Sequence, residues 1–203
     1  MKRKTLVIGA LLVMLFNANV SAQDRKRVYE VPEKHVSLLL VRDPNCPIQL
    51  SDPRFLKYEK GTFEKVYSVT NASGKAVIRF QIKELSWLGG QENTINSTLV
   101  EGQTFLPDET FSTLSNEDQL EFLAFDEKVL QDPYFRQRAK DIWIVIVTKV
   151  EMVDGGVYDV SSKYEEIKKF IEELGGELYG SSPNVPATEC ELKEFISKKF
   201  CCF

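Results

Sequence analysis

Residues 63–83 read FEKVYSVTNASGKAVIRFQIK, and this stretch contains the clearest strand pattern in the chain. In its second half, apolar and polar side chains alternate, which is the period of a strand with one buried face. The pattern places four apolar side chains on that face: Ala76, Ile78, Phe80 and Ile82. Residues 63–70 are rich in aromatic and β-branched side chains, and Asn71-Ala72-Ser73-Gly74 supplies turn-forming residues between the two runs. The sequence therefore predicts two strands joined as a β-hairpin.

A second hairpin is predicted over residues 141–160. Residues 141–153 are apolar on both faces of an extended chain, which is typical of a strand covered on both sides at the centre of a sheet. One face holds Ile142, Ile144, Ile146, Val150 and Met152, and the other holds Trp143, Val145, Val147 and Val153. Asp154-Gly155-Gly156 forms the predicted turn, and residues 157–160 return beside the first strand.

Shorter strand candidates fill much of the remaining chain. They are residues 36–41, 47–50, 55–58, 97–100 and 110–114. With the two hairpins they make about seven to nine short strands separated by turn signals. We therefore expect a mainly β domain over residues 23–160, folded as an antiparallel β-sandwich.

The strand pattern lapses between residues 115 and 140. Ser115-Asn116-Glu117-Asp118 is typical of a helix N-terminus, and Leu120, Leu123 and Leu130 partly fit helical spacing before Asp132-Pro133 ends the run. This pattern predicts an inserted helix or a long crossover connection. Four aromatic residues in the segment are expected to plug one end of the sandwich: Phe122, Phe125, Tyr134 and Phe135.

Residues 161–203 are predicted to form a C-terminal α-helical appendage. Ser162 and Glu165 form a capping box, helical spacing of apolar residues follows, and Gly175-Gly176 ends the predicted helix. A linker over residues 178–188 leads to a second helix, residues 189–200. One face of that helix carries Leu192, Phe195, Ile196 and Phe200. We expect it to cover the sandwich, with docking of a partner helix as the functional alternative.

Residues 1–22 have the pattern of a secretory signal peptide. Lys2, Arg3 and Lys4 precede an apolar run over residues 5–16, and Val20-Ser21-Ala22 is a small-residue cleavage pattern. The run is shorter than the roughly 20 residues that span a bilayer, which disfavours an uncleaved anchor. We therefore expect a secreted or periplasmic protein with no transmembrane segment after cleavage.

The charge balance limits the classes of partner. Cleavage would remove three positive charges and change the formal net charge from −4 to −7. Nucleic acids and anionic membranes need basic surfaces, so we expect neither as a partner. The basic cluster Arg25-Lys26-Arg27 is expected to lie in a frayed, hydrated end. Gly89-Gly90 and Gly155-Gly156 lack the further glycines and the lysine of a phosphate-binding loop, and we expect no cofactor.

Four cysteines are candidates for disulfide bonds in an oxidising compartment: Cys46, Cys190, Cys201 and Cys202. If residues 189–200 are helical, Cys190 and Cys201 lie about 16 Å apart, which is too far to bridge. A bond between Cys201 and Cys202 would close a strained ring. We therefore expect Cys46 to bond one tail cysteine, while a metal site at the tail is the alternative disfavoured by the absence of a CxxC pair.

Few catalytic arrangements fit the sequence. His35 is the sole histidine and no GxSxG motif accompanies any serine, which disfavours a Ser-His or Cys-His catalytic pair and excludes a histidine-based zinc site. A glycoside hydrolase needs only two carboxylates across a cleft. The candidates at strand ends are Glu84, Glu101, Asp154 and Asp159, although solvated surface charge is the simpler interpretation.

Residues 67–78, YSVTNASGKAVI, resemble a strand–turn–strand element of exported bacterial immunoglobulin-like β-sandwich proteins. Residues 150–158, VEMVDGGVY, resemble the closing hairpin of similar secreted proteins. The resemblance implies an Ig-like topology and supplies no catalytic residues.

We accordingly expect an exported, non-enzymatic binding or accessory protein with an unknown protein or glycan partner outside the cytoplasm. The candidate interaction surface comprises Trp87, Leu88, Phe195 and Ile196. The alternatives are a secreted hydrolase with paired carboxylates and an inhibitor or interaction partner of another secreted protein.

The export prediction can be checked by the intact mass of the protein recovered from the exported fraction. We expect a chain that begins at Gln23 and is lighter by about 2 Da for each disulfide, measured without reductant. A mass that retains residues 1–22 would contradict the predicted cleavage.

Overall fold

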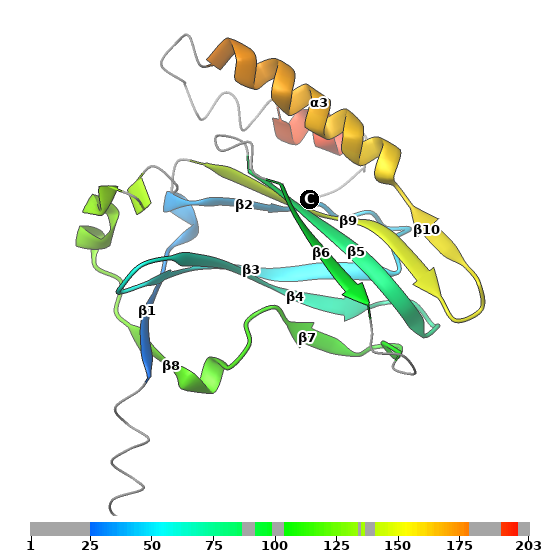
Figure 1. Cartoon of the computed structure of the whole chain (residues 1–203), viewed down its shortest axis with the longest axis horizontal. Helices are drawn as coiled ribbons and strands as arrows, with labels where there is room; N and C mark the ends of the chain where they lie inside the picture. The colour runs from blue at the N-terminus through cyan, green and yellow to red at the C-terminus, as the bar shows by residue number, and fades with distance from the viewer. Residues whose placement is uncertain are drawn as a thin grey trace, which may run out of the picture.

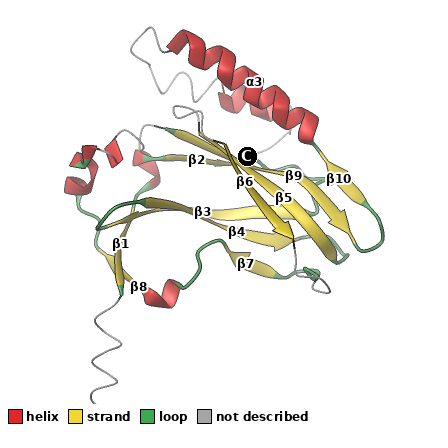
Figure 2. Ribbon diagram, viewed as in Figure 1, coloured by secondary structure: helices red, strands yellow, loops and turns green. Residues whose placement is uncertain are grey.

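The computed structural model describes residues 25–86, 92–98, 104–133, 135–136, 141–178 and 192–198, with side chains described outside 92–98 and 171–178. Two sheets face each other, and helices cover the outer side of one of them (Figures 1 and 2). The mainly β class that the sequence predicts is confirmed.

The first sheet contains five strands in the order β7-β4-β3-β1-β8. Their bounds are Thr110–Ser112 for β7, Phe63–Asn71 for β4, Ile48–Tyr58 for β3, Lys26–Glu30 for β1 and Leu120–Leu123 for β8. Strand β1 was not expected from the sequence, which placed its basic residues in a frayed end. It pairs antiparallel with β3 and parallel with β8, so this basic segment is an interior strand of the sheet.

The second sheet is built around the long strand β9. Its path β10-β9-β5-β6 is joined by β2, which pairs with β9. The bounds are Val157–Asp159 for β10, Ile142–Met152 for β9, Val77–Ser86 for β5, Glu92–Thr98 for β6 and Ser37–Leu40 for β2. The predicted hairpin between β9 and β10 is confirmed, whereas β2 runs parallel to β9. The expectation of a wholly antiparallel sandwich is therefore wrong at the β1–β8 and β2–β9 pairs, because each joins segments too distant in sequence for local patterns to report.

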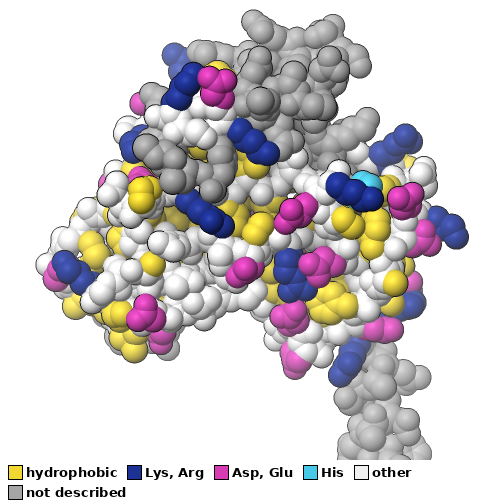
Figure 3. Space-filling model, turned by 180° about the vertical axis from the view of Figure 1, so that it is seen from behind, with side chains coloured by type: hydrophobic (Ala, Val, Ile, Leu, Met, Phe, Trp, Pro, Cys, Tyr) yellow, Lys and Arg dark blue, Asp and Glu magenta, His cyan; other side chains and the backbone are white. Residues whose placement is uncertain are grey.

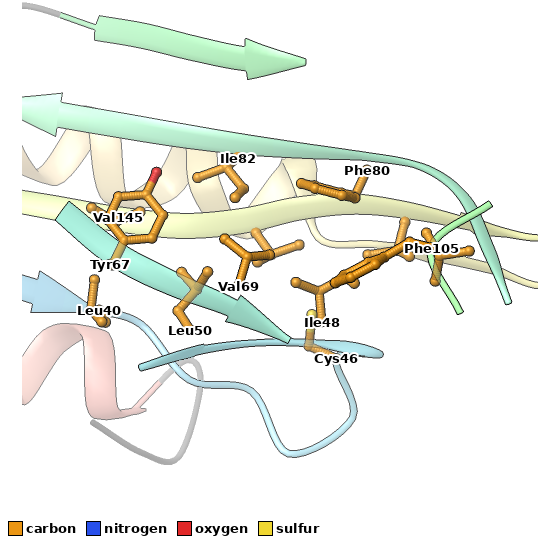
Figure 4. Packing of buried hydrophobic residues seen from close by; sticks show 13 residues of the cluster. Leu40, Cys46, Ile48, Leu50, Tyr67, Val69, Phe80, Ile82, Phe105 and Val145 are labelled. Carbon is orange, nitrogen blue, oxygen red and sulfur yellow. The ribbon is translucent and has the colours of Figure 1, made fainter. Parts of the chain in front are cut away.

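The hairpin predicted over residues 63–83 is wrong, because β4 and β5 belong to different sheets. The two strands face each other through side chains instead of backbone hydrogen bonds. Tyr67 and Val69 of β4 pack against Phe80 and Ile82 of β5 in the core between the sheets (Figure 4). The turn at residues 71–76 is therefore an arch that carries the chain from one sheet to the other.

Asn71 holds this arch together from a fully buried position. Its Nδ2 donates hydrogen bonds to the carbonyl oxygens of Lys75, at 2.9 Å, and Phe105, at 2.8 Å. Its Oδ1 accepts from the backbone N–H and the hydroxyl of Ser73. One side chain thus satisfies polar groups of the arch and of the distant Phe105 segment, as buried polar groups require.

Two register shifts change which side chains are buried. One lies between Val77 and Arg79, so that Ile78, predicted to be buried, is 39% exposed while Val77 is buried. The other leaves Thr148 without a ladder partner, because Gln81 pairs with Lys149 and Ile82 with Val147. As in a β-bulge, the extra residue inverts the alternation that follows.

The Thr148 shift moves Val150 and Met152 away from the isoleucine face predicted for them. Both pack in the core between the sheets. The prediction that β9 is covered on both sides is confirmed, since its isoleucines pack under the helices and Val145 and Val147 face the first sheet.

The long helix α3, Ser161–Leu178, covers the outer face of the second sheet. It starts one residue before the predicted capping box, with the Asp159 carboxylate accepting from the backbone N–H of Ser161 at 2.9 Å. It also continues through Gly175-Gly176, so the predicted stop is wrong.

The second helical stretch, residues 192–198, covers the same face of the sheet, as predicted. Leu192 and Ile196 are fully buried, and the Phe195 ring stacks on Phe170 with centroids 4.0 Å apart. Within the described residues, no helix combines the length and the apolar character needed to cross a membrane.

The described part of the segment 115–140, residues 115–133, 135 and 136, contains a crossover and no long helix. The 3-10 turns η2, Glu117–Gln119, and η3, Glu127–Gln131, flank β8, while η1 covers Glu33–His35. The leucines at 120 and 123 fit a short strand as well as a helix, and pairing with β1 selects the strand.

Phe135 is fully buried against Phe55, and Phe125 packs on the same cluster, so the predicted aromatic plug is confirmed for these two residues. Phe122 instead is 41% exposed, and Tyr134 lies outside the described residues.

Replacing Asn71 should test the arch. Asn71→Ala removes the four hydrogen bonds of this buried amide, and we expect the free energy of unfolding in urea to fall by about 3 kcal/mol. The exposed Asn45→Ala serves as a control with an effect of at most about 0.5 kcal/mol. Equal effects of the two substitutions would contradict the role given to Asn71.

Candidate functional site

A cleft of about 330 Å³ opens at one end of the first sheet, beside the η3 turn. Its lining combines aromatic rings with charged groups of both signs. The residues are Tyr29, Lys57, Tyr58, Glu59, Asp126, Lys128, Val129 and Asp132. They come from β1, the end of β3 with the residue that follows it, and the 126–132 segment, which the fold brings together although they are distant in sequence.

The floor of the cleft is formed around Lys57, whose side chain is only 4% exposed. Its Nζ donates to the carbonyl oxygens of Tyr58, at 2.8 Å, and Gly61, at 3.0 Å. The same nitrogen lies 3.3 Å from Oδ2 of Asp132. Gly61 has a φ of 100°, a conformation that few residues other than glycine adopt, and this turn presents its carbonyl to the ammonium. Lys57 therefore fastens the end of η3 to the β3–β4 turn.

Two tyrosines belong to the walls. Tyr29 is paired with Lys57 in the β1–β3 ladder and is half-buried. The Tyr58 hydroxyl donates to Oε2 of Glu64 at 2.7 Å. Burial, together with this carboxylate, raises the pKa of Tyr58 to about 12, so the phenol stays neutral at ordinary pH.

The rim carries opposite charges in close alternation. Asp126 accepts from the backbone N–H of Lys128 at 2.9 Å and begins η3. Glu59 pairs with Arg27 at 2.9 Å, and the Lys128 side chain is largely exposed. On the face opposite to that of Figure 1, Lys and Arg side chains are likewise interspersed with Asp and Glu (Figure 3).

The chemistry of this cleft is hydrogen bonding combined with ring contact. Tyrosine rings offer flat apolar surfaces, Lys128 offers a donor, and three carboxylates offer acceptors. The described residues contain no group of three side chains arranged to hold a metal ion.

The carboxylates proposed for a hydrolase do not share this cleft. Glu84 is buried between the sheets, 2.9 Å from Nζ of Lys65. It is paired with Val145 in the β5–β9 ladder, whereas Asp159 is paired with Lys149 in the β9–β10 ladder and caps α3. The hydrogen bond from the Ser161 backbone lowers the pKa of Asp159.

Asp154 lies in the β9–β10 turn, where it pairs with Lys75 at 2.5 Å and the hydrogen bond from this lysine lowers its pKa. Glu101 lies outside the described residues. The three described candidates thus each have a local partner and are not brought together.

The described residues among the other predicted site residues lie outside the cleft. Trp87 and Leu88 lie outside the described residues, and Ile196 is buried against the second sheet with Phe195 half-buried beside it. His35 stacks on Phe125 with centroids 5.6 Å apart, away from Cys46, which is buried in the core between the sheets (Figure 4).

Cys46 has a free thiol in the described part of the structure. Cys190, Cys201 and Cys202 lie outside that part, so the predicted bond from Cys46 to the tail is not seen.

Sequence reasoning missed the cleft entirely. Its aromatic and charged residues follow no common motif, and their proximity depends on pairing β1 with β3 and on the Lys57 contacts. The only local signal of the cleft was the presence of charged residues in predicted turns.

Comparisons with known proteins identify no family. No protein-family model matches the chain, and no curated protein sequence matches it. One solved structure similar to this chain is a hypothetical protein from Peptoclostridium difficile 630, with 13% sequence identity and a TM-score of 0.28. The match covers 63% of this chain and 93% of that one. A TM-score this low supports no inference about function.

The state of Cys46 can be measured by alkylation. Burial raises the pKa of its thiol to about 12, so iodoacetamide at about pH 8 should leave Cys46 unmodified in the native protein. After unfolding without reductant, peptide mapping should find Cys46 alkylated. Recovery of Cys46 in a disulfide-linked peptide would contradict the free thiol and support the pairing predicted from the sequence.

Proposed function

We propose that this protein is a non-enzymatic binding protein whose cleft takes a neutral, polyhydroxylated ligand, namely a segment of a glycan. The observation that carries the proposal is the combination of tyrosine rings with alternating donors and acceptors around one cleft. A sugar ring presents hydroxyl groups that both donate and accept, together with C–H faces that pack on aromatic rings. The lining residues match both properties.

The charges of the cleft favour a neutral ligand over an ion. Lys57 already directs its ammonium to two carbonyl oxygens and Asp132, so it is not poised to bind an anion. An anionic ligand would also meet Glu59 and Asp126, and a cation would meet Lys128. A neutral ligand with many hydroxyl groups avoids both conflicts.

The place of action proposed for this protein is outside the cytoplasm. The signal-peptide pattern of residues 1–22 supports export. Because the described carboxylate candidates lie apart, we prefer binding to hydrolysis as the function.

Calorimetric titration of the full-length protein with chitotetraose, cellotetraose, xylotetraose and maltotetraose tests the proposal. We expect at least one to bind, and Tyr29→Ala to weaken that binding about tenfold, because a ring contact contributes about 1 kcal/mol or more. Phe122→Ala, which removes an exposed aromatic outside the cleft, is the matched control and should leave the affinity unchanged. Binding unaffected by Tyr29→Ala, or no binding to any of the four sugars, would contradict the assignment.

A further inference from the structure

One lysine and one carboxylate meet across the interior of the sandwich. Lys65 projects from β4 in the first sheet and Glu84 from β5 in the second, and Nζ lies 2.9 Å from Oε2. The two side chains are 9% and 7% exposed. By contrast, the Lys75–Asp154 pair is 58% and 47% exposed and lies in a hydrated turn.

The surroundings hold both groups in one geometry. The Lys65 ammonium lies 3.8 Å from the centre of the Trp143 ring, and the fully buried Tyr67 donates from its hydroxyl to Oε1 of Glu84 at 3.1 Å. Two ions removed from water carry a large desolvation penalty, which a neutral product would not.

From this geometry we propose that Lys65 and Glu84 become joined by an amide bond between Nζ and the side-chain carbonyl carbon Cδ. The bond would be an internal covalent link from one sheet to the other. It is a modification of the folded chain and is independent of any ligand in the cleft.

The reaction is a condensation that balances without an oxidant or a cofactor. A proton passes from the ammonium to Oε2, and the lone pair of the resulting amine attacks Cδ to form the C–N bond. Negative charge develops on Oε1, and this oxygen accepts the hydrogen bond from the Tyr67 hydroxyl. A proton then moves from the nitrogen to the departing hydroxyl, the C–O bond breaks, and one water leaves.

Three features of the structure favour this step. Fixed contact between amine and acyl groups replaces an encounter in solution, which is the effect measured as a high effective molarity. The donor aimed at Oε1 lies where negative charge develops, as in an oxyanion hole. Burial and the neighbouring Glu84 raise the pKa of Tyr67, so that its hydroxyl keeps the proton that it donates.

Peptide mass mapping of the full-length protein after tryptic digestion tests the proposal. We expect a branched peptide joining the segments that contain Lys65 and Glu84, lighter than their sum by about 18 Da, the mass of the water lost. Cleavage by trypsin after an unmodified Lys65 would overturn the proposal. A loss of about 17 Da, with Lys65 bonded to an asparagine, would overturn the assignment of Glu84 as the acyl group.

Variants add an internal control. Lys65→Arg keeps the positive charge but removes the amine, so the branched peptide should disappear. Lys75→Arg changes an exposed lysine that also pairs with a carboxylate and should leave the link intact. Tyr67→Phe should lower the cross-linked fraction in freshly purified protein, and complete linking in that variant would overturn the role of the Tyr67 hydroxyl. If Lys65→Arg does not fold, the wild-type peptide map still decides the question.

Discussion

The arch at Asn71 is the constraint on which the two-sheet arrangement depends. Four hydrogen bonds of one buried amide close the turn and attach it to the Phe105 segment. Because the arch directs β4 and β5 into opposite sheets, their apolar faces meet and form the centre of the core. A hairpin at the same place would have put both strands in one sheet, and their apolar faces would then have needed other elements to pack against.

Strand β9 serves two cores at once, and this explains its composition. Its isoleucines pack against α3 and the 192–198 helix, while its valines pack against β3 and β4. The bulge at Thr148 changes which side chains face the core. Beyond it, the outer face of the strand carries charged residues, where Glu151 pairs with Arg79 and Lys149. The same sheet therefore is buried on both faces at one end, and at the other end one of its faces is exposed to water.

The sequence predicts what depends on local periodicity and misses what depends on distant pairing. The two-faced pattern of β9, the Asp154-Gly155-Gly156 turn and the amphipathic terminal helices are visible in the sequence, and the structure contains them. Asn71 can form the same turn hydrogen bonds in a hairpin and in an arch, so the residues next to it in the sequence do not distinguish the two. Bulges at Ile78 and Thr148 invert the alternation without any glycine or proline to announce them. The cleft was beyond sequence reasoning for a related reason, since Tyr29, Lys57 and Asp132 meet only after the first sheet has formed.

The two parallel pairs have a consequence for the order of folding. Strand β1 obtains its second neighbour only when residues 120–123 are available, and β2 pairs with residues 142–145. Contacts of such long sequence separation require the closure of large loops before they contribute stability, which slows folding. A chain that emerges from its N-terminus onward can complete neither sheet until most of its length is free. Such a topology gives the polypeptide a delay, set by its own connectivity, before its native sheets can form.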